Sequence, residues 1–195
     1  YTVSPVEGQS GKAAKLQTVY TYMFLNGMDF NALLGGLVPY VTAGSLFTGI
    51  FKTDMNNTLN STKFGVPFVG EPATFTGYYK YTPGTTYYNN KNEVVADKTD
   101  ECSIYAVLYE ELLDEENNNI PLNGDYNDPD LYIGSSKRIV MKAVLEDGTA
   151  KSDWTKFSIP FKLSFKPVFF NKNKEVEICK LKCVESISHL AAMQF

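Results

Sequence analysis

The chain has 195 residues, enough for one sizeable domain with its own hydrophobic core. Hydrophobic residues make up 44% and charged residues 21%, a globular composition that excludes a disordered chain. The formal net charge is −4 and no stretch is strongly basic, which argues against nucleic acid or an anionic membrane surface as a partner. Aromatic residues reach 14%, with thirteen Tyr and thirteen Phe, and this enrichment favours β-strands.

In chain order, the sequence is a series of short apolar runs bounded by Gly, Pro, Asn or Asp. The one patch with helical spacing, residues 109–116, has an apolar stripe too brief for a helix. Strands without intervening helices predict an all-β fold: a jelly-roll sandwich of two antiparallel sheets, in a single domain spanning residues 1–195. The expected strands lie at residues 13–22, 45–53, 72–82, 102–112, 137–148 and 154–163, with a polar loop at 114–136.

The uncharged stretch 30–51 is long enough to cross a bilayer. It contains four glycines and a proline, and it breaks into two short pieces at residues 39–44. A strand followed by a loop explains it better than a membrane span, so we expect no membrane insertion. The opening residues 1–12 do not have the character of a signal peptide, and we expect them to start inside a longer precursor.

The cysteines and the oxygen-rich loop give little support for a metal or a disulfide framework. Three cysteines cannot all pair with one another, and Cys102 lies in an apolar run typical of a small core residue. Cys179, Cys183 and His189 together lack a fourth ligand for structural zinc. The segment 123–130 favours a solvated loop, because a proline interrupts the alternate spacing of an EF-hand loop. We expect no cofactor, with structural Ca²⁺ in that loop as the alternative left open.

Alternation along the strands sorts the side chains into a buried and an outward set. In the stretch FTGYYKYTPG, residues 75–84, Phe75, Tyr79 and Tyr81 share the side predicted to be buried, because Lys80 marks the opposite side as solvated. In residues 102–109 the apolar set at even positions suits a core. The prediction is an open face of rings and polar groups formed by Tyr78, Lys80, Tyr105, Tyr109, Arg138 and Lys142.

Five segments then follow one another over residues 9–161: SGKAAKL (10–16), GSLFTGIF (44–51), GVPFVGEPATFTGYYKYTPG (65–84), DECSIYAVLYE (100–110) and SDWTKFSIPF (152–161). Together they resemble the PCMD family, a carbohydrate metabolism domain of surface or periplasmic proteins from gut bacteria that live on polysaccharides. The resemblance implies a jelly-roll sandwich similar to carbohydrate-binding modules. It also implies export to the periplasm or outer-membrane surface, in a lipoprotein that carries a preceding domain.

The C-terminal residues 171–195 depart from the family pattern, which ends in a strand resembling GSxLxVDD. We therefore expect an atypical tail, with an irregular or incomplete C-terminal end that affects one edge of the sandwich.

Non-catalytic binding of an oligo- or polysaccharide is the predicted function. The apolar face of a pyranose packs on an aromatic plane while its hydroxyls take hydrogen bonds from polar side chains, in a concave site. Trp154 supplies either such a plane or an anchor at the end of the sandwich. The residues predicted to bind the glycan are Tyr78, Lys80, Tyr105, Tyr109, Arg138 and Trp154.

Two alternatives remain open. A glycoside hydrolase needs two carboxyl groups across the scissile bond, one with a raised pKa. The available acids at strand ends are Asp100, Glu101, Glu110, Glu111 and Asp153, and no motif singles out a pair. The second alternative is a structural or adhesion module, because a tyrosine-rich, weakly charged face also suits contact with another protein.

Overall fold

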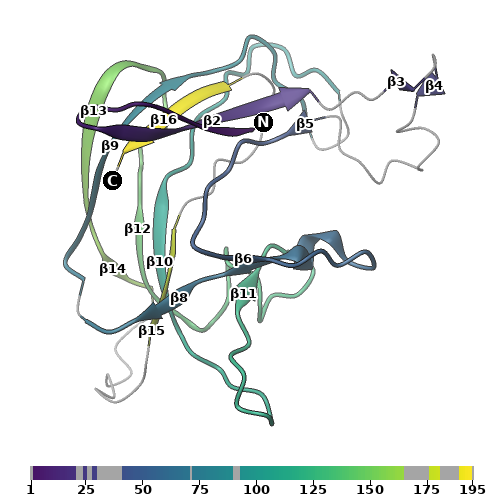
Figure 1. Cartoon of the computed structure of the whole chain (residues 1–195), viewed down its shortest axis with the longest axis vertical. Helices are drawn as coiled ribbons and strands as arrows, with labels where there is room; N and C mark the ends of the chain where they lie inside the picture. The colour runs from purple at the N-terminus through teal and green to yellow at the C-terminus, as the bar shows by residue number, and fades with distance from the viewer. Residues whose placement is uncertain are drawn as a thin grey trace.

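The computed structural model describes residues 2–20, 24–25, 28–29, 41–70, 72–89, 93–164, 176–180 and 189–194 (Figure 1). Within these residues the secondary structure is β-strand apart from one short 3-10 helix, η1 (Thr58–Ser61). The predicted all-β sandwich of antiparallel sheets is confirmed. Among the described residues, no helix is long and apolar enough to span a membrane; part of the stretch 30–51 lies outside them.

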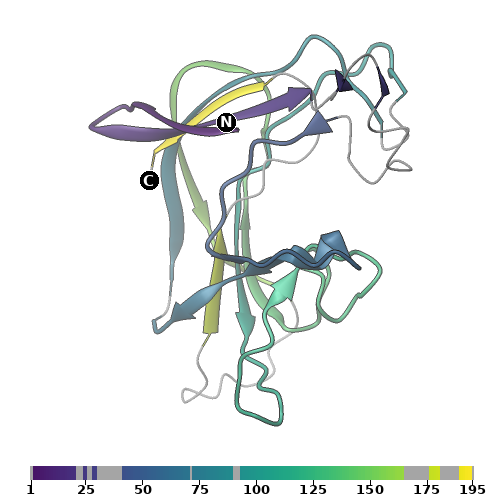
Figure 2. The same cartoon turned by 45° about the vertical axis from the view of Figure 1, so that its right-hand side comes forward.

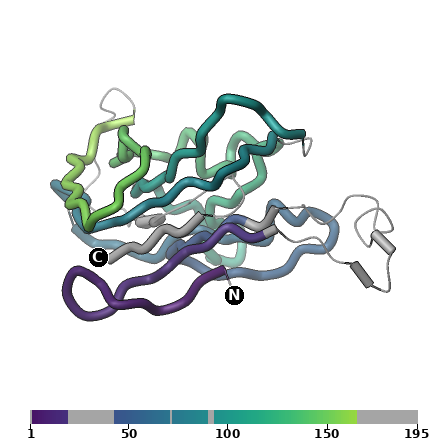
Figure 3. Tube along the Cα trace, turned by 90° about the horizontal axis from the view of Figure 1, so that it is seen from above, coloured from purple at the N-terminus to yellow at the C-terminus, as the bar shows by residue number. Residues whose placement is uncertain are grey.

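The first sheet contains the long strand β9 and the N-terminal strands (Figure 1). Its order is β1 (Val3–Glu7), β2 (Lys12–Tyr20), β16 (His189–Gln194), β9 (Thr74–Thr82) and β13 (Lys151–Pro160), and β5 (Val41–Thr42) pairs with β2. Seen from above, the purple β1–β2 hairpin lies on one flank of the molecule and the green segment that carries β12 to β14 on another (Figure 3).

The second sheet has the order β14 (Lys162–Leu163), β12 (Ile139–Val144), β10 (Tyr105–Glu110), β15 (Val176–Lys180) and β8 (Val66–Phe68). The chain passes from one sheet to the other between β8 and β9, β9 and β10, β12 and β13, β13 and β14, and β15 and β16. These repeated crossings are typical of a jelly roll. The strands expected near 72–82, 102–112, 137–148 and 154–163 are all present, with ends shifted by a few residues.

The C-terminal segment requires a correction. Its two described strands do not lie at an edge: β15 pairs with both β10 and β8, and β16 pairs with both β2 and β9. The tail therefore supplies an interior strand to each sheet, although its sequence departs from the family pattern.

Two small sheets complete the fold. One has the order β11 (Leu122–Asn123), β7 (Thr62–Phe64) and β6 (Gly49–Phe51), and β6 lies within the strand expected at 45–53. Figure 2 shows β6 and β11 together with η1 beside the lower part of the sandwich. The other is the pair β3 (Phe24–Leu25) and β4 (Met28–Asp29), which lies at the periphery (Figure 1).

The inner core lies between the two main sheets. From the first sheet it contains Leu16, Phe75, Tyr79, Tyr81 and Phe157; from the second sheet and the segment leading into it, it contains Cys102, Ile104, Ala106 and Ala143. The alternation predicted for β9 is confirmed, because Phe75, Tyr79 and Tyr81 are all buried. The two phenols reach polar partners: Tyr79 donates to the Asp147 carbonyl at 3.1 Å and Tyr81 to the Asp100 carboxylate at 2.8 Å.

An outer core lies on the other side of β10 and contains Phe64, Val107, Tyr109, Leu122, Ile133 and Ile139. It packs the small β6–β7–β11 sheet and the segment around Ile133 against the second main sheet. Strand β10 is therefore buried on both faces: Ala106 and Leu108 point one way, Val107 and Tyr109 the other, and all four are buried. The prediction that Tyr109 lies on an open face is wrong for this reason.

The buried phenol of Tyr79 makes the stability of the fold sensitive to alkaline pH. Burial raises the pKa of Tyr79 to about 12, with smaller contributions from Cys102 and Asp147. The pKa of an unfolded tyrosine is about 10, so this group contributes stability that is complete below pH 10 and lost as the pH rises from 10 to 12. In urea unfolding at pH 8 to 12, we expect the wild-type free energy of unfolding to fall more steeply above pH 10 than that of Tyr79→Phe. Parallel pH profiles for the two proteins would contradict this expectation.

Candidate functional site

The six predicted binding residues separate into two groups on different sheets. Tyr78, Lys80 and Trp154 lie on β9 and β13 of the first sheet, whereas Tyr105 and Tyr109 lie on β10. Arg138 directly precedes β12 in the second sheet. The structure therefore brings three of the six together, and the other three belong to the side of the sandwich that the outer core covers.

The outward side of β9 follows from its buried side. Phe75, Gly77, Tyr79 and Tyr81 are buried, so the alternate residues point away from the inner core. Tyr78 and Lys80 are partly exposed there, and Lys156 of β13 stands directly opposite Tyr78 and is exposed. The outward direction of Tyr78 and Lys80 agrees with the prediction.

Trp154 of β13 lies on the same side, two residues before Lys156 and at a bulge in this strand. Lys151 pairs with Tyr81 and Thr155 with Tyr79, so residues 152–154 of β13 stand against Lys80 alone. The Lys80 ammonium lies 5.5 Å from the centroid of the Trp154 ring, within the range of a cation–π contact. We call the surface formed by Tyr78, Lys80, Trp154 and Lys156 the ring face.

The ring face continues across the sheet toward β2. Position 80 pairs with position 192 of β16, which pairs with Lys15 of β2. Lys15 is partly exposed and lies on the side opposite Leu16, which is in the inner core. The sequence prediction did not include Lys15 and Lys156 in the site. Strand register places Lys156 opposite Tyr78 and Lys15 across β16 from Lys80, and this register is not visible in the sequence.

Tyr105 lies on the other sheet. It is partly buried, it packs against the outer core, and it stands opposite Val144 of β12. The prediction that Tyr78, Tyr105 and Tyr109 emerge together on one face is therefore wrong, because β9 and β10 belong to different sheets.

Tyr109 and Arg138 have structural roles. Tyr109 is fully buried, and its hydroxyl donates to the Phe64 carbonyl at 2.5 Å. The Arg138 guanidinium lies 5.1 Å from the Tyr109 ring centroid and donates to the carbonyls of Glu110 at 2.9 Å and Ile120 at 2.7 Å. Arg138 thereby holds the chain that follows β10 against the outer core, and its contact with a glycan stays a prediction.

The carboxyl groups give no direct indication of a catalytic acid. Asp100 accepts the Tyr81 hydroxyl, Glu110 ends β10, and Asp153 lies in the β13 bulge of the other sheet. Hydrogen bonds from neighbouring side chains and backbone amides lower the pKa of the carboxyl groups of Asp54, Asp114, Asp125 and Asp147. A general acid of a glycosidase needs the opposite shift, so these four groups are unsuited to that role.

The loop at residues 123–130 is built from hydrogen bonds within the protein. The Asp125 carboxylate accepts from the side chain of Asn57 at 2.6 Å and from the backbone amide of Asn127 at 2.9 Å. Asp128 accepts from the amides of Asp130 and Leu131. Across the described part of the chain, no group of three or more His, Cys, Asp or Glu residues is arranged to hold a metal ion.

The cysteine predictions are tested only in part. Cys102 is buried, as predicted, in the inner core. Cys183 lies outside the described residues, and Cys179 and His189 are described by their strand positions alone.

Comparison with known proteins points to carbohydrate metabolism. The family model described as "Putative carbohydrate metabolism domain" (PCMD) matches residues 1–181. This is the family whose motifs the sequence resembles. No curated protein matches the chain.

Two solved structures share the fold. The crystal structure of "a putative glycoside hydrolase" from Bacteroides thetaiotaomicron VPI-5482 has a TM-score of 0.77 and 26% identity, covering 100% of this chain and 55% of that chain. The chain thus spans about half the length of that protein. A second structure with the same description, from Bacteroides vulgatus ATCC 8482, has a TM-score of 0.72 and 24% identity, covering 99% of this chain and 75% of that chain.

The two tyrosines Tyr109 and Tyr78 provide a direct test of which aromatic residues belong to the core. We expect Tyr109→Ala to lower the free energy of unfolding by about 3–5 kcal/mol, because it opens a cavity in the outer core and leaves the Phe64 carbonyl without its donor. Tyr78→Ala removes a partly exposed ring and is expected to cost about 1 kcal/mol or less. Urea denaturation of both variants measures the difference, and equal losses would contradict the assignment of Tyr109 to the core.

Proposed function

We propose that this chain, which belongs to the PCMD family of carbohydrate metabolism domains, binds carbohydrate and catalyses no reaction. The ring face is the proposed binding surface. One observation carries this proposal: Trp154 of β13 lies beside Lys80 on the outward side of the first sheet, with Tyr78 on the same side. Three of the residues predicted to contact a glycan therefore share one accessible surface.

The chemistry of the ring face suits a sugar. Aromatic planes pack against the C–H face of a pyranose, and ammonium groups donate hydrogen bonds to its hydroxyls. Here the two aromatic side chains alternate with Lys80 and Lys156, so each ring has a donor next to it. The surface is also braced from behind, because β9 carries Phe75, Tyr79 and Tyr81 into the inner core on its other side. A rigid surface loses little conformational entropy when a ligand binds.

An enzymatic function is the second candidate, since the neighbour with 26% identity is described as a glycoside hydrolase. That protein is longer than this chain, and the shared part is about half of it. Catalysis would require two carboxyl groups roughly 5–10 Å apart across a sugar bond, one with a raised pKa. The clearly shifted carboxyl groups of the described residues shift the other way, which favours binding over hydrolysis.

We further propose that the domain acts outside the cytoplasm, at the periplasm or outer-membrane surface, as one part of a longer polysaccharide-utilisation protein. A domain that binds polysaccharide meets its ligand where the intact polymer is present, and an intact polysaccharide is too large to reach the cytoplasm. An adhesion or structural role predicts instead that the ring face binds protein and retains no glycan.

Variants of the ring face test the binding proposal. In affinity electrophoresis through neutral polysaccharides, chosen by a glycan-array screen of the purified protein, we expect Trp154→Ala and Tyr78→Ala each to weaken binding by about tenfold or more. Each variant loses the burial of one ring against the sugar. The matched control is Tyr126→Ala, which removes a tyrosine that is 65% exposed on the 123–130 loop.

The thermal midpoints of the two ring-face variants are expected to stay within a few degrees of the wild-type value, because both side chains point away from the inner core. Undiminished binding by the double variant Tyr78→Ala/Trp154→Ala would exclude the ring face as the glycan site. Hydrolysis of the polysaccharide by the purified chain would favour the enzymatic alternative.

A further inference from the structure

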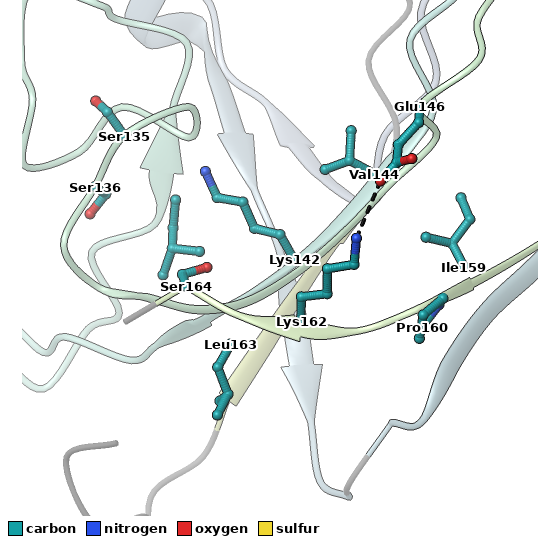
Figure 4. Close-up of a pocket in the computed structure, with 11 residues that line it drawn as sticks. Ser135, Ser136, Lys142, Val144, Glu146, Ile159, Pro160, Lys162, Leu163 and Ser164 are labelled. Carbon is teal, nitrogen blue, oxygen red and sulfur yellow. Dashed lines mark hydrogen bonds and ion pairs between the residues drawn. The ribbon is translucent and has the colours of Figure 1, made fainter. Parts of the chain in front are cut away.

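A second candidate site lies at the edge of the second sheet, where β12 pairs with β14 (Figure 4). It is a cavity of about 440 Å³, within the range of small-molecule sites. We call it the Lys142 pocket. Its lining includes Lys142, Val144, Glu146, Pro160, Lys162 and Ser164.

The pocket contains two lysines in direct cross-strand register. Lys142 of β12 stands opposite Lys162 of β14, an arrangement that places like charges side by side. Lys162 forms an ion pair with Glu146, with 3.2 Å between the ammonium and the carboxylate, which balances one of the two charges (Figure 4). Lys142 extends instead toward the loop that carries Ser135 and Ser136 and donates to the Gly134 carbonyl at 2.9 Å (Figure 4).

The charge of Lys142 is therefore not balanced by a carboxylate within the described part of the chain. Its one acceptor there is a neutral carbonyl, and an ammonium has three N–H donors. Lys142 is also half-buried, and this burial lowers the pKa of its ammonium below the usual value. A half-buried cation without a counter-charge attracts an anion, because the attraction is stronger where water is partly excluded.

A buried hydroxyl lies at the same cavity. The Ser164 Oγ is shielded from solvent and has no hydrogen-bond partner in the part of the chain that the structure describes. Buried polar atoms of this kind are rare in folded proteins, since each costs free energy until it is paired. Because Ser164 lines the pocket, rotation of its side chain would bring this hydroxyl to a ligand oxygen there.

Part of the remaining wall is apolar, and its one carboxylate, Glu146, is paired with Lys162. Val144, which is 46% exposed, and Pro160 line the pocket together with Ile159. Such a wall favours a ligand that has a C–H surface as well as a charge, and a free inorganic anion has no such surface. A carboxylate attached to a pyranose ring combines both features.

We propose that the Lys142 pocket binds a uronic acid residue of an acidic glycan, with the sugar carboxylate held by Lys142 and Ser164 and the ring against Val144 and Pro160. The choice of a sugar rests on the proposed function, whereas the choice of a carboxylate rests on the pocket. No described residue of the ring face lines this pocket, so variants of the two sites test the two proposals separately.

The test uses one oligosaccharide in two charge states. An oligogalacturonide and its methyl ester share a backbone and differ in the negative charge of the carboxyl groups. With the full chain, isothermal titration calorimetry is expected to show binding of the acid at least tenfold tighter than binding of the ester, and the difference is expected to shrink at high salt. Acetate is the third ligand, and it is expected to bind at least tenfold more weakly than the acid because it lacks the ring.

Lys142→Met removes the charge and keeps most of the side chain's length, so we expect it to weaken binding of the acid about tenfold to a hundredfold, the size of a charged hydrogen bond. Ser164→Ala is expected to weaken it several-fold and to leave the fold intact, because the hydroxyl loses no partner among the described residues. The control Lys52→Met makes the same charge change at an exposed position on another part of the surface and is expected to bind like the wild type.

Equal affinity for the acid and the ester, or unchanged affinity in both Lys142→Met and Ser164→Ala, would overturn the proposal. Loss of acid binding in Trp154→Ala but not in Lys142→Met would also overturn it and would place acidic sugars on the ring face. Binding of the acid that depends on Lys142 supports the pocket even where neutral glycans fail to bind, an outcome that contradicts the ring-face proposal alone.

Discussion

The burial of β10 on both faces is the constraint on which the rest of the structure depends. The inner core covers one face of this strand, and the outer core, closed by the Tyr109 hydroxyl on the Phe64 carbonyl, covers the other. Arg138 adds a second link by holding the carbonyls of Glu110 and Ile120 beside the Tyr109 ring. Within the described residues, β10 at the centre of the second sheet therefore offers no open face to a ligand, and the two candidate surfaces lie on the outward side of the first sheet and at an edge of the second.

In the first sheet, one set of alternate side chains of β9 fills the inner core, so the other set points outward. Phe75, Tyr79 and Tyr81 all point into the inner core, and the two phenols are anchored at their tips by Asp147 and Asp100. A strand fixed in this way holds its alternate side chains in fixed directions, which is what a preorganised contact surface requires. Strand β13 then adds Trp154, which lies two residues before Lys156 on the same side and contacts Lys80.

The sequence predicted β9 well and β10 poorly, for an identifiable reason. In β9, Lys80 shows which set of alternate residues faces water, and the buried set is the one opposite it. Residues 102–109 carry no charged residue, so alternation there divides the side chains into two sets without saying which is solvated. From residue 106 to residue 109 both sets are buried, and the segments that cover the outer one come from distant parts of the chain, around Phe64, Leu122 and Ile133. The register that unites Tyr78 with Lys156, the bulge at Trp154 and the interior positions of β15 and β16 are likewise long-range features that a local pattern does not contain.

Strand β13 connects the two proposed sites. Trp154 lies near its start, Lys156 and Ser158 follow on the outward side, and Pro160 at its end lines the Lys142 pocket. At about 3.3 Å per residue, Trp154 and Pro160 are roughly 20 Å apart along one rigid strand. Two sites at a fixed separation do not act independently on a polymer, because binding at one raises the effective concentration of the chain at the other. A glycan with neutral and acidic sugars at that spacing would gain affinity from both sites, whereas a neutral polymer would use the ring face alone. Selectivity would then come from where the charges lie along the polymer, with neither site needing to bind tightly.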